Sequence, residues 1–290
     1  MNILLIGHNG QVGWELRRTL APLAQVVAVD YPEIDFSDTT GLRRLVAETR
    51  PSVVVNAAAY TAVDKAETEK ALCHQVNATG PEVLAQAAKA AGALLVHYST
   101  DYIFNGTKQT PYVETDTPNP LGVYGESKLA GDQGVLASGV DHLILRLCWV
   151  YGARGQNFLL TMQRLARERE QLCVVQDQMG CPTWARMIAE TTALALKQVT
   201  GSADRSAFNG TYHLAAAGST SWHGFASRII DLMPAADRKC REVVGITTAA
   251  YPTPAKRPAY SVLNCDKLQA TFGLRLPDWE VSLRQVLDQP

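Results

Sequence analysis

Short apolar runs alternate with amphipathic stretches along the first half of the chain. The runs are continuous rather than alternating, as is typical of strands that are covered on both faces of a parallel sheet. They predict strands at 3–6, 26–29, 52–56, 94–98 and 143–148. The stretches between them have apolar residues at helical spacing and predict helices at 14–20, 39–50, 64–72, 77–91 and from 123 onward. Five or six such alternations predict an α/β fold, a Rossmann-type doubly wound parallel sheet with helices on both sides.

After about residue 149 the pattern becomes less regular. It predicts strands at 172–175 and 210–215 and helices at 157–170, 184–198, 222–233, 266–272 and 279–287. Shorter strands and longer loops in this half predict a smaller α/β domain that caps the sheet. We therefore expect one domain over 1–148, to which a strand near 210–216 returns, and a second domain mainly over 149–290. The cleft between two such domains is where a substrate is expected.

A glycine loop joins the first predicted strand to the first predicted helix. Gly7, Gly10 and Gly13 are spaced three apart, which departs from the usual G-x-G-x-x-G. Glycines let a pyrophosphate approach the main chain closely, and the amides at a helix N-terminus attract the same anion. Asp30 ends the second predicted strand, where a carboxylate can accept hydrogen bonds from an adenine ribose. Together these features predict a dinucleotide site in residues 1–148; a plain glycine turn is the alternative.

Hydroxyl and phenol groups follow the later strands. Ser99 and Thr100 stand at the carboxyl end of the predicted strand 94–98, where doubly wound sheets keep their chemistry. Tyr124 and Lys128 are four residues apart and therefore lie on one helix face. A phenol has an unperturbed pKa of about 10, and a neighbouring cation lowers that pKa. The pair predicts a tyrosine acid with a lysine partner; a helix-surface pair is the alternative, and the choice between the Ser99 and Thr100 hydroxyls stays open.

The composition excludes several classes of protein. Lys plus Arg number 27 and Asp plus Glu 28, for a net charge of −1, so nothing favours nucleic acid or an anionic membrane as a partner. The sequence shows neither a signal peptide nor an apolar run of membrane-spanning length, which predicts a cytoplasmic protein. Six cysteines lack C-x-x-C spacing and are expected to be reduced and mostly buried. The six histidines show no ligand spacing.

Several motifs together resemble those of the extended short-chain dehydrogenase/reductase superfamily. They are Gly7-x-x-Gly10-x-x-Gly13, Asn56-Ala57-Ala58-Ala59, Ser99-Thr100-Asp101-Tyr102 and Tyr124-x-x-x-Lys128. Four longer runs resemble, more closely, the dTDP-4-dehydrorhamnose reductase family. These runs are His97 to Phe104, Cys148 to Gly152, Asp177-Gln178-x-Gly180-x-Pro182-Thr183, and Tyr251 to Pro258. The resemblance spans nearly the whole chain in the expected order.

This resemblance implies an enzyme that uses NADH or NADPH to reduce the C4 ketone of dTDP-4-dehydro-L-rhamnose, in the synthesis of dTDP-L-rhamnose for cell-surface polysaccharides such as O-antigen. It implies Tyr124 as proton donor, Lys128 as its partner and ribose ligand, and Thr100 as a tuning hydroxyl. The implied cofactor contacts are Gly7, Gly10, Gln11, Val12, Gly13, Asp30, Asp35, Phe36, Ala59, Tyr60 and Thr61, with Tyr124 and Lys128. The implied substrate contacts are Thr100, Asp101, Trp149 and Arg257.

Alternatives remain within the same superfamily. A dehydratase would carry an Asp-Glu pair beside the hydroxyl, whereas Asp101 and Tyr102 follow Thr100 here, which favours reduction. An epimerase and a non-catalytic regulatory subunit are the other readings. Asp30 favours NADH, because a carboxylate repels a 2′-phosphate, with NADPH ranked close behind. Trp149 is alternatively a core aromatic and Arg257 a surface ion pair.

The resemblance also raises a magnesium-linked dimer. Glu15 matches one expected ligand, but Arg186 stands where another is expected, and no acidic cluster with the spacing of a hard-metal site appears elsewhere. A metal-linked dimer is therefore disfavoured. The chain is expected to act as a monomer or homodimer, with a dTDP-sugar as its ligand.

Overall fold

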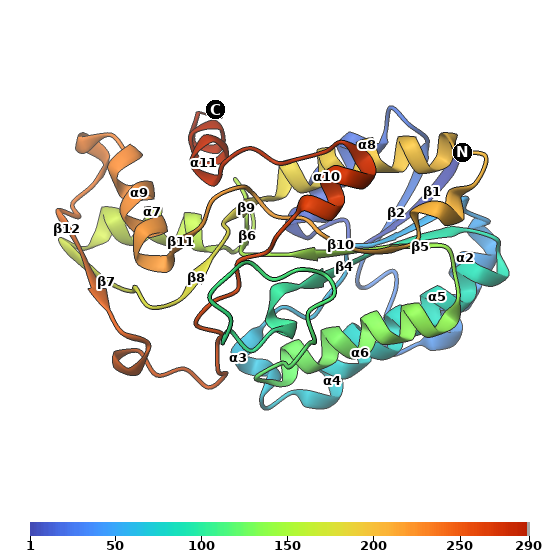
Figure 1. Ribbon diagram of the computed structural model, residues 1–290, viewed down its shortest axis with the longest axis horizontal. Helices are drawn as coiled ribbons and strands as arrows, with labels where there is room; N and C mark the ends of the chain where they lie inside the picture. The colour runs from blue at the N-terminus through green and yellow to red at the C-terminus, as the bar shows by residue number, and fades with distance from the viewer. Residues whose placement is uncertain (289–290) are drawn as a thin grey trace.

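A six-stranded parallel sheet forms the centre of the computed structural model, which describes residues 1–288 (Figure 1). Its strand order is β10-β5-β4-β3-β1-β2, and every pairing is parallel. The strands are β1 (Asn2–Ile6), β2 (Gln25–Val29), β3 (Val53–Asn56), β4 (Leu94–Thr100), β5 (His142–Leu147) and β10 (Gly210–His213). This sheet confirms the predicted α/β class of fold.

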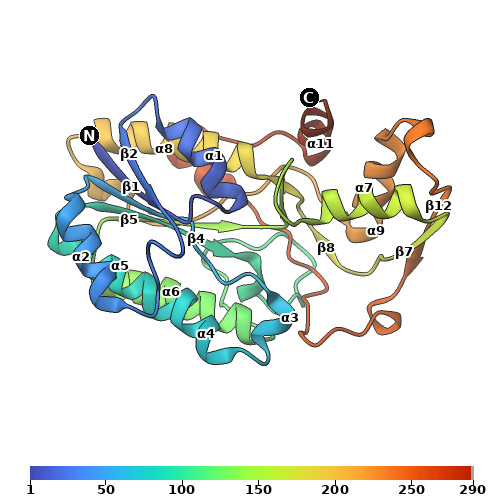
Figure 2. The same ribbon diagram turned by 180° about the vertical axis from the view of Figure 1, so that it is seen from behind.

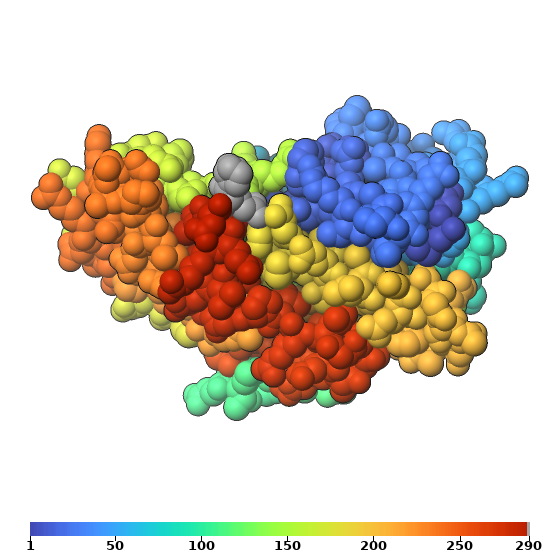
Figure 3. All heavy atoms as spheres, turned by 90° about the horizontal axis from the view of Figure 1, so that it is seen from above, coloured from blue at the N-terminus to red at the C-terminus, as the bar shows by residue number. Residues whose placement is uncertain are grey.

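Helices cover both faces of the sheet, which explains why the strands are continuously apolar. Ile3 and Leu5 pack into one core and Leu4 and Ile6 into the other, because successive side chains point to opposite faces. One face is covered by α1 (Gln11–Leu20), α8 (Ala185–Gly201) and α10 (Asp266–Phe272). The other face is covered by α2 (Thr39–Thr49), α5 (Gly80–Ala90) and α6 (Val123–Ser138), as Figures 1 and 2 show. Seen from above, the yellow atoms of α8 lie between the blue N-terminal and the red C-terminal segments (Figure 3).

The chain between β3 and α5 is more broken than predicted. Instead of one helix over 64–72, it forms α3 (Val63–Ala66) and, after a turn, α4 (Lys70–His74). A π-helical turn (Gln75–Thr79) then leads into α5. This turn carries the buried side chain of Asn77 to the backbone of Tyr60, where it accepts from the Tyr60 N–H at 2.8 Å and donates to the Tyr60 carbonyl at 3.0 Å. The π turn therefore anchors the loop that follows β3.

A smaller lobe lies beyond one end of the sheet (Figure 2). Its core is built from α7 (Phe158–Glu168), α9 (Trp222–Leu232), α11 (Trp279–Leu287) and the parallel pair β7 (Gln171–Val175) and β12 (Glu242–Ile246). Two more pairs have strands of two residues each: β6 (Val150–Tyr151) with β9 (Thr183–Trp184), and β8 (Met179–Gly180) with β11 (Thr220–Ser221). The two-residue strands were not predicted, since two residues carry no periodic pattern, and β12 was not predicted either.

Three general features complete the fold. All six cysteines are free, and Cys73, Cys148, Cys181 and Cys240 are buried. Between residues 1 and 288, no helix is both long enough and apolar enough to cross a bilayer. The short 3₁₀ turns are at Asp101–Ile103, Arg205–Phe208, Ala235–Asp237 and Thr248–Ala250.

Candidate active site

A cleft of about 1090 Å³ opens at the carboxyl ends of the strands. It lies next to β1, which has β2 on one side and β3 on the other. The strand order reverses its direction here, so the connections run to opposite sides of β1 and leave a crevice between them. Small-molecule sites typically enclose about 300–1,000 Å³, so this cleft has room for a dinucleotide and a second ligand. The predicted site residues that line it are Gly7, Gly10, Gln11, Val12, Asp30, Asp35, Phe36, Ala59, Tyr60, Thr61, Thr100, Asp101, Tyr124, Lys128 and Trp149.

The glycine loop is packed so closely that side chains are excluded at two of its three glycines. Gly7 has φ +86°, and a Cβ there would collide with the backbone of Ala58. A Cβ on Gly13 would collide with the Gly7 carbonyl, which explains why Gly13 lies behind the cleft lining. A Cβ on Gly10 would approach only the Gly7 carbonyl, at 3.5 Å, so Gly10 keeps the loop surface open. This cradle at the N-terminus of α1 fits a dinucleotide pyrophosphate.

Asp30 is fixed at the far end of this loop. Its Oδ2 accepts from the Asn9 N–H at 2.8 Å, and its Oδ1 accepts from the Tyr31 N–H at 2.8 Å. Farther along, the Ser37 N–H donates to Asp35 Oδ1 at 2.8 Å and lowers the pKa of the exposed Asp35 carboxyl. The ring of Phe36 is buried against Gly80, where a Cβ would collide with it. This end of the cleft thus presents a carboxylate and a fixed apolar wall.

Thr100, Tyr124 and Lys128 meet at the carboxyl end of β4. The Thr100 hydroxyl donates to Asp101 Oδ1 at 3.1 Å and accepts from the Tyr102 N–H at 3.2 Å. Burial raises the pKa of Tyr124, while a hydrogen bond with Thr100 acts in the opposite direction. The strand extends two residues beyond its predicted end at residue 98 and so includes the Thr100 hydroxyl.

Lys128 lies deeper than a lysine on a helix surface. Only 2% of it is exposed, and its Nζ donates to the Tyr98 carbonyl at 2.6 Å. Burial lowers the pKa of Lys128 to about 8, and the charge of Asp132 acts against that decrease. The ammonium is therefore the main form of Lys128 at neutral pH, held by β4 at the wall of the cleft.

Three residues that the resemblance implies for substrate binding differ in their position relative to the cleft. Asp101 lines the cleft, but its carboxylate is engaged by Thr100 and by the Cys148 thiol, which donates to Oδ2 at 3.2 Å. Trp149 has φ +43° and stacks on Trp222 at 3.5 Å between ring centroids. Arg257 is outside the cleft lining.

Sequence reasoning missed part of the cleft wall. Trp222, Gly155 and Gln156 line it from the second lobe, and Leu72 and Val76 from the segment after β3. Trp222 begins α9, seventy-three residues after the tryptophan on which it stacks. No local pattern marks such a residue, because only the tertiary fold brings the two rings together.

Glu15 and Arg186, which stand at two positions of a possible metal site, form an ion pair. Arg186 Nε lies 3.3 Å from Glu15 Oε2, across the contact between α1 and α8. Over residues 1–288, no three His, Cys, Asp or Glu side chains are grouped so as to hold a metal ion.

Comparisons with known proteins agree over the full length of the chain. A family model described as the RmlD substrate binding domain matches residues 1–290. The curated dTDP-4-dehydrorhamnose reductase of Burkholderia thailandensis is 51% identical over 288 residues, which cover 98% of this chain and 97% of the relative. A crystal structure of a dTDP-4-dehydrorhamnose reductase from Clostridium acetobutylicum has a TM-score of 0.92 at 37% identity and covers 99% of both chains. That of Bacillus anthracis, solved in complex with NADP, has a TM-score of 0.90 at 35% identity and covers 99% of this chain and 98% of the other.

Proposed function

The chain belongs to the RmlD substrate binding domain family, and we propose that it is an NAD(P)H-dependent reductase that converts dTDP-4-dehydro-L-rhamnose to dTDP-L-rhamnose. The full-length likeness to a curated reductase of that name carries this proposal. The structure supports it with a cleft at the switch point of the sheet, bordered by a glycine cradle and by a tyrosine, a threonine and a lysine. The reaction belongs in the cytoplasm, where NAD(P)H and sugar nucleotides are available.

The cofactor half of the cleft is assigned to the first lobe. We propose that Gly7, Gly10 and the N-terminus of α1, with Gln11 and Val12, hold the pyrophosphate. Asp30 would accept hydrogen bonds from the adenosine ribose, with Asp35 and Phe36 along the adenine. Gly13 supports the cradle from behind. Ala59, Tyr60 and Thr61 would then face the nicotinamide half.

The reacting groups follow from this placement. When bound, a reduced nicotinamide supplies a hydride to the C4 carbonyl carbon of the sugar. Tyr124 donates its phenolic proton to the C4 oxygen, and the Thr100 hydroxyl orients that phenol. Lys128, as an ammonium, stabilises the phenolate that remains and holds the nicotinamide ribose.

The second lobe is assigned to the sugar nucleotide. Trp149 and Trp222 present stacked rings to the cleft and would pack against the substrate. We propose that Asp101 fixes the Thr100 hydroxyl rather than reaching the sugar itself, because both of its oxygens already accept hydrogen bonds. Arg257 is assigned to the diphosphate, in exchange for its contact with Asp64.

One assay tests the proposal. The chain is offered the product that a dehydratase and an epimerase form from dTDP-glucose, and nicotinamide absorbance is followed with NADH and with NADPH. We expect coenzyme consumption in proportion to sugar, with dTDP-L-rhamnose as product. Conversion of the sugar without coenzyme consumption would indicate an epimerase, and no conversion with either coenzyme would contradict the proposal.

A further inference from the structure

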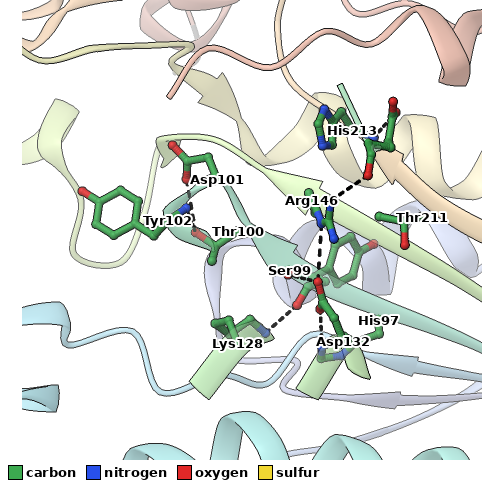
Figure 4. Close-up of polar contacts among 12 residues, drawn as sticks. His97, Ser99, Thr100, Asp101, Tyr102, Lys128, Asp132, Arg146, Thr211 and His213 are labelled. Atoms are coloured by element: carbon green, nitrogen blue, oxygen red, sulfur yellow. Dashed lines mark hydrogen bonds and ion pairs between the residues drawn. The ribbon is translucent and has the colours of Figure 1, made fainter. Parts of the chain in front are cut away.

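A buried polar cluster lies directly beneath the proposed active site (Figure 4). Lys128 and Asp132 are one turn apart on the face of α6 that packs on β4. His97 and Ser99 point to them from β4, and Arg146 points from β5. All five residues are buried, with Lys128 2% and Asp132 1% exposed. Burial of this many charged groups is costly unless each is paired, so their arrangement requires an explanation.

The Asp132 carboxylate is the centre of the cluster. Its Oδ2 accepts from the Ser99 hydroxyl at 2.8 Å and from Arg146 Nε at 3.4 Å. Arg146 also donates from Nη1 to the Glu114 carbonyl at 3.5 Å, which holds its guanidinium in place. Burial raises the pKa of Asp132, while the charges of Arg146 and Lys128 and the hydrogen bond from Ser99 oppose that increase. Its cationic neighbours and Ser99 thus favour the carboxylate form, against the effect of burial.

Hydrogen bonds also fix the state of His97. Asn56 Oδ1 accepts from the Ala58 N–H at 3.3 Å, so the Asn56 amide nitrogen faces His97 Nδ1, at 3.2 Å, as a donor. His97 Nδ1 is then the acceptor, and the ring proton is on Nε2. That nitrogen lies 3.8 Å from Asp132 Oδ1. Burial lowers the pKa of His97 well below its ordinary value, so the ring adds a polar N–H near the carboxylate but no charge.

The charges around Lys128 are therefore unequal. The Asp132 carboxyl lies one turn along α6, and Arg146, a buried cation on β5, is 3.4 Å from it. The other titratable groups that face the lysine are neutral: Tyr124 on α6, His97 on β4, and the Cys73 thiol on α4, whose pKa burial raises. Without Asp132, Lys128 would lose the anion whose charge acts against the burial of its ammonium. Lys128 would then release its proton more readily, whereas the Arg146 guanidinium retains its proton.

We propose that Asp132 is a positioning residue for the reaction: its carboxylate keeps Lys128 in the ammonium form, while Arg146 and Ser99 keep that carboxylate ionised. The inference rests on the proposed function, since Lys128 matters only if Tyr124 is the proton donor. Asp132 does not line the cleft and acts through the lysine alone. It therefore sets the pH range over which the tyrosine has a cationic partner.

The test is the pH dependence of kcat in Asp132→Asn. Asparagine keeps the shape of the side chain and an acceptor for Ser99 but removes the charge. The pKa of Lys128 is about 8 in the wild type, so kcat should decrease only about twofold from about pH 6 to about pH 8. Loss of the Asp132 charge lowers that pKa further, so kcat should decrease about tenfold or more over the same range and recover on acidification.

Three further variants make the result decisive. Asp132→Glu retains the charge and should restore most of the activity at about pH 8. Ser99→Ala removes the hydrogen bond to the carboxylate and should shift the alkaline limb in the same direction by less. Asp141→Asn, an equal change in an ion pair with Arg205 away from the cleft, should leave the pH profile unchanged.

The outcomes separate this inference from the function on which it rests. Wild-type turnover of the dTDP-sugar establishes the function first, and its absence would contradict that proposal alone. If Asp132→Asn loses the same factor of kcat at every pH, or changes only KM, Asp132 has a structural role and the inference is overturned. If Asp132→Asn does not fold, the Ser99→Ala profile decides, and an unshifted limb there overturns the inference.

Discussion

The Arg257 guanidinium and the Asp64 carboxylate form an ion pair, with Nη2 2.8 Å from Oδ2. The second Asp64 oxygen accepts from the Ala255 N–H at 3.2 Å, so one carboxylate binds two points of the C-terminal extended segment. The hydrogen bond from Arg257 lowers the pKa of Asp64. This contact ties residues 255–257 to α3, beside the loop that follows β3.

If Arg257 exchanges this partner for a diphosphate, the two ends of the pair respond differently to mutation. Arg257→Ala should raise KM for the sugar nucleotide about tenfold or more with a smaller change in kcat, because a charge-assisted contact of about 1.5–3 kcal/mol is lost. Asp64→Asn frees the arginine and should leave that KM unchanged or lower it. Steady-state kinetics with saturating coenzyme measure both. An equal increase of KM in the two variants would assign Arg257 a purely structural contact.

Removal of the Tyr124 hydroxyl tests the proton donor. Tyr124→Phe should lower kcat by about 10²–10⁴, the usual contribution of a positioned general acid, and leave coenzyme affinity nearly unchanged. Stopped-flow reduction and fluorescence titration with NADH measure the two quantities. Tyr151→Phe is the matched control, because that hydroxyl is buried with no hydrogen-bond partner. Near wild-type turnover in Tyr124→Phe would remove the tyrosine from the mechanism.

Asp30 should decide between the two coenzymes. Its carboxylate is fixed by the Asn9 and Tyr31 backbone amides, so it cannot readily turn away from a 2′-phosphate. We expect the wild type to have a higher kcat/KM with NADH than with NADPH. Asp30→Ser should move that ratio toward NADPH by about tenfold or more, which corresponds to about 1.4 kcal/mol. A ratio unchanged by the mutation would mean that the ribose is bound elsewhere.

The buried carboxyl of Asp101 should make the free energy of unfolding depend on pH. Burial raises the pKa of this carboxyl from 3.8 to about 6. A carboxyl whose pKa is higher in the folded chain binds its proton more tightly there, so the folded state loses stability as pH rises from about 4 to about 6. Asp101→Asn removes this loss. Relative to wild type, its free energy of unfolding should increase by roughly 2–3 kcal/mol over that range.

Urea unfolding at a series of pH values measures this difference. Asp141→Asn serves as the control of opposite sign. The pKa of Asp141 is lowered by Asn209 and Arg205, so its charge stabilises the folded chain above pH 4, and its removal should decrease stability at neutral pH. Equal pH slopes in wild type and Asp101→Asn would show that this carboxyl titrates normally.

Much of the sheet was predictable because its residues obey local rules. Residues 3–6, 53–55 and 94–96 are apolar at every position, as is typical of strands that are covered on both faces. The role of Gly7 was also predictable, because the turn that ends β1 has a positive φ, which residues other than glycine rarely adopt. By contrast, β12 (Glu242–Ile246) was missed, because it is only half buried and its pairing partner, β7, is distant in sequence.

The candidate site, too, was only partly predictable from local sequence patterns. Tyr124 and Lys128 could be paired from their helical spacing, but the spacing does not reveal that Lys128 is buried and bonded to the Tyr98 carbonyl. Asp132 continues the same helical spacing, yet its importance appears only when Arg146 and His97 arrive from two strands. Buried charges are defined by their neighbours, and those neighbours are set by tertiary packing.

The last strand of the central sheet, β10, comes from residues 210–213, after α7, α8 and the β6–β9 pair. A ribosome must therefore deliver more than two thirds of the polypeptide before β5 gains its outer neighbour. A fragment ending near residue 150 would leave that edge open, with Leu143 and Leu145 among the side chains uncovered. Such a fragment should aggregate rather than bind nucleotide. A shortened protein that contains the first lobe must therefore also include residues 185–216.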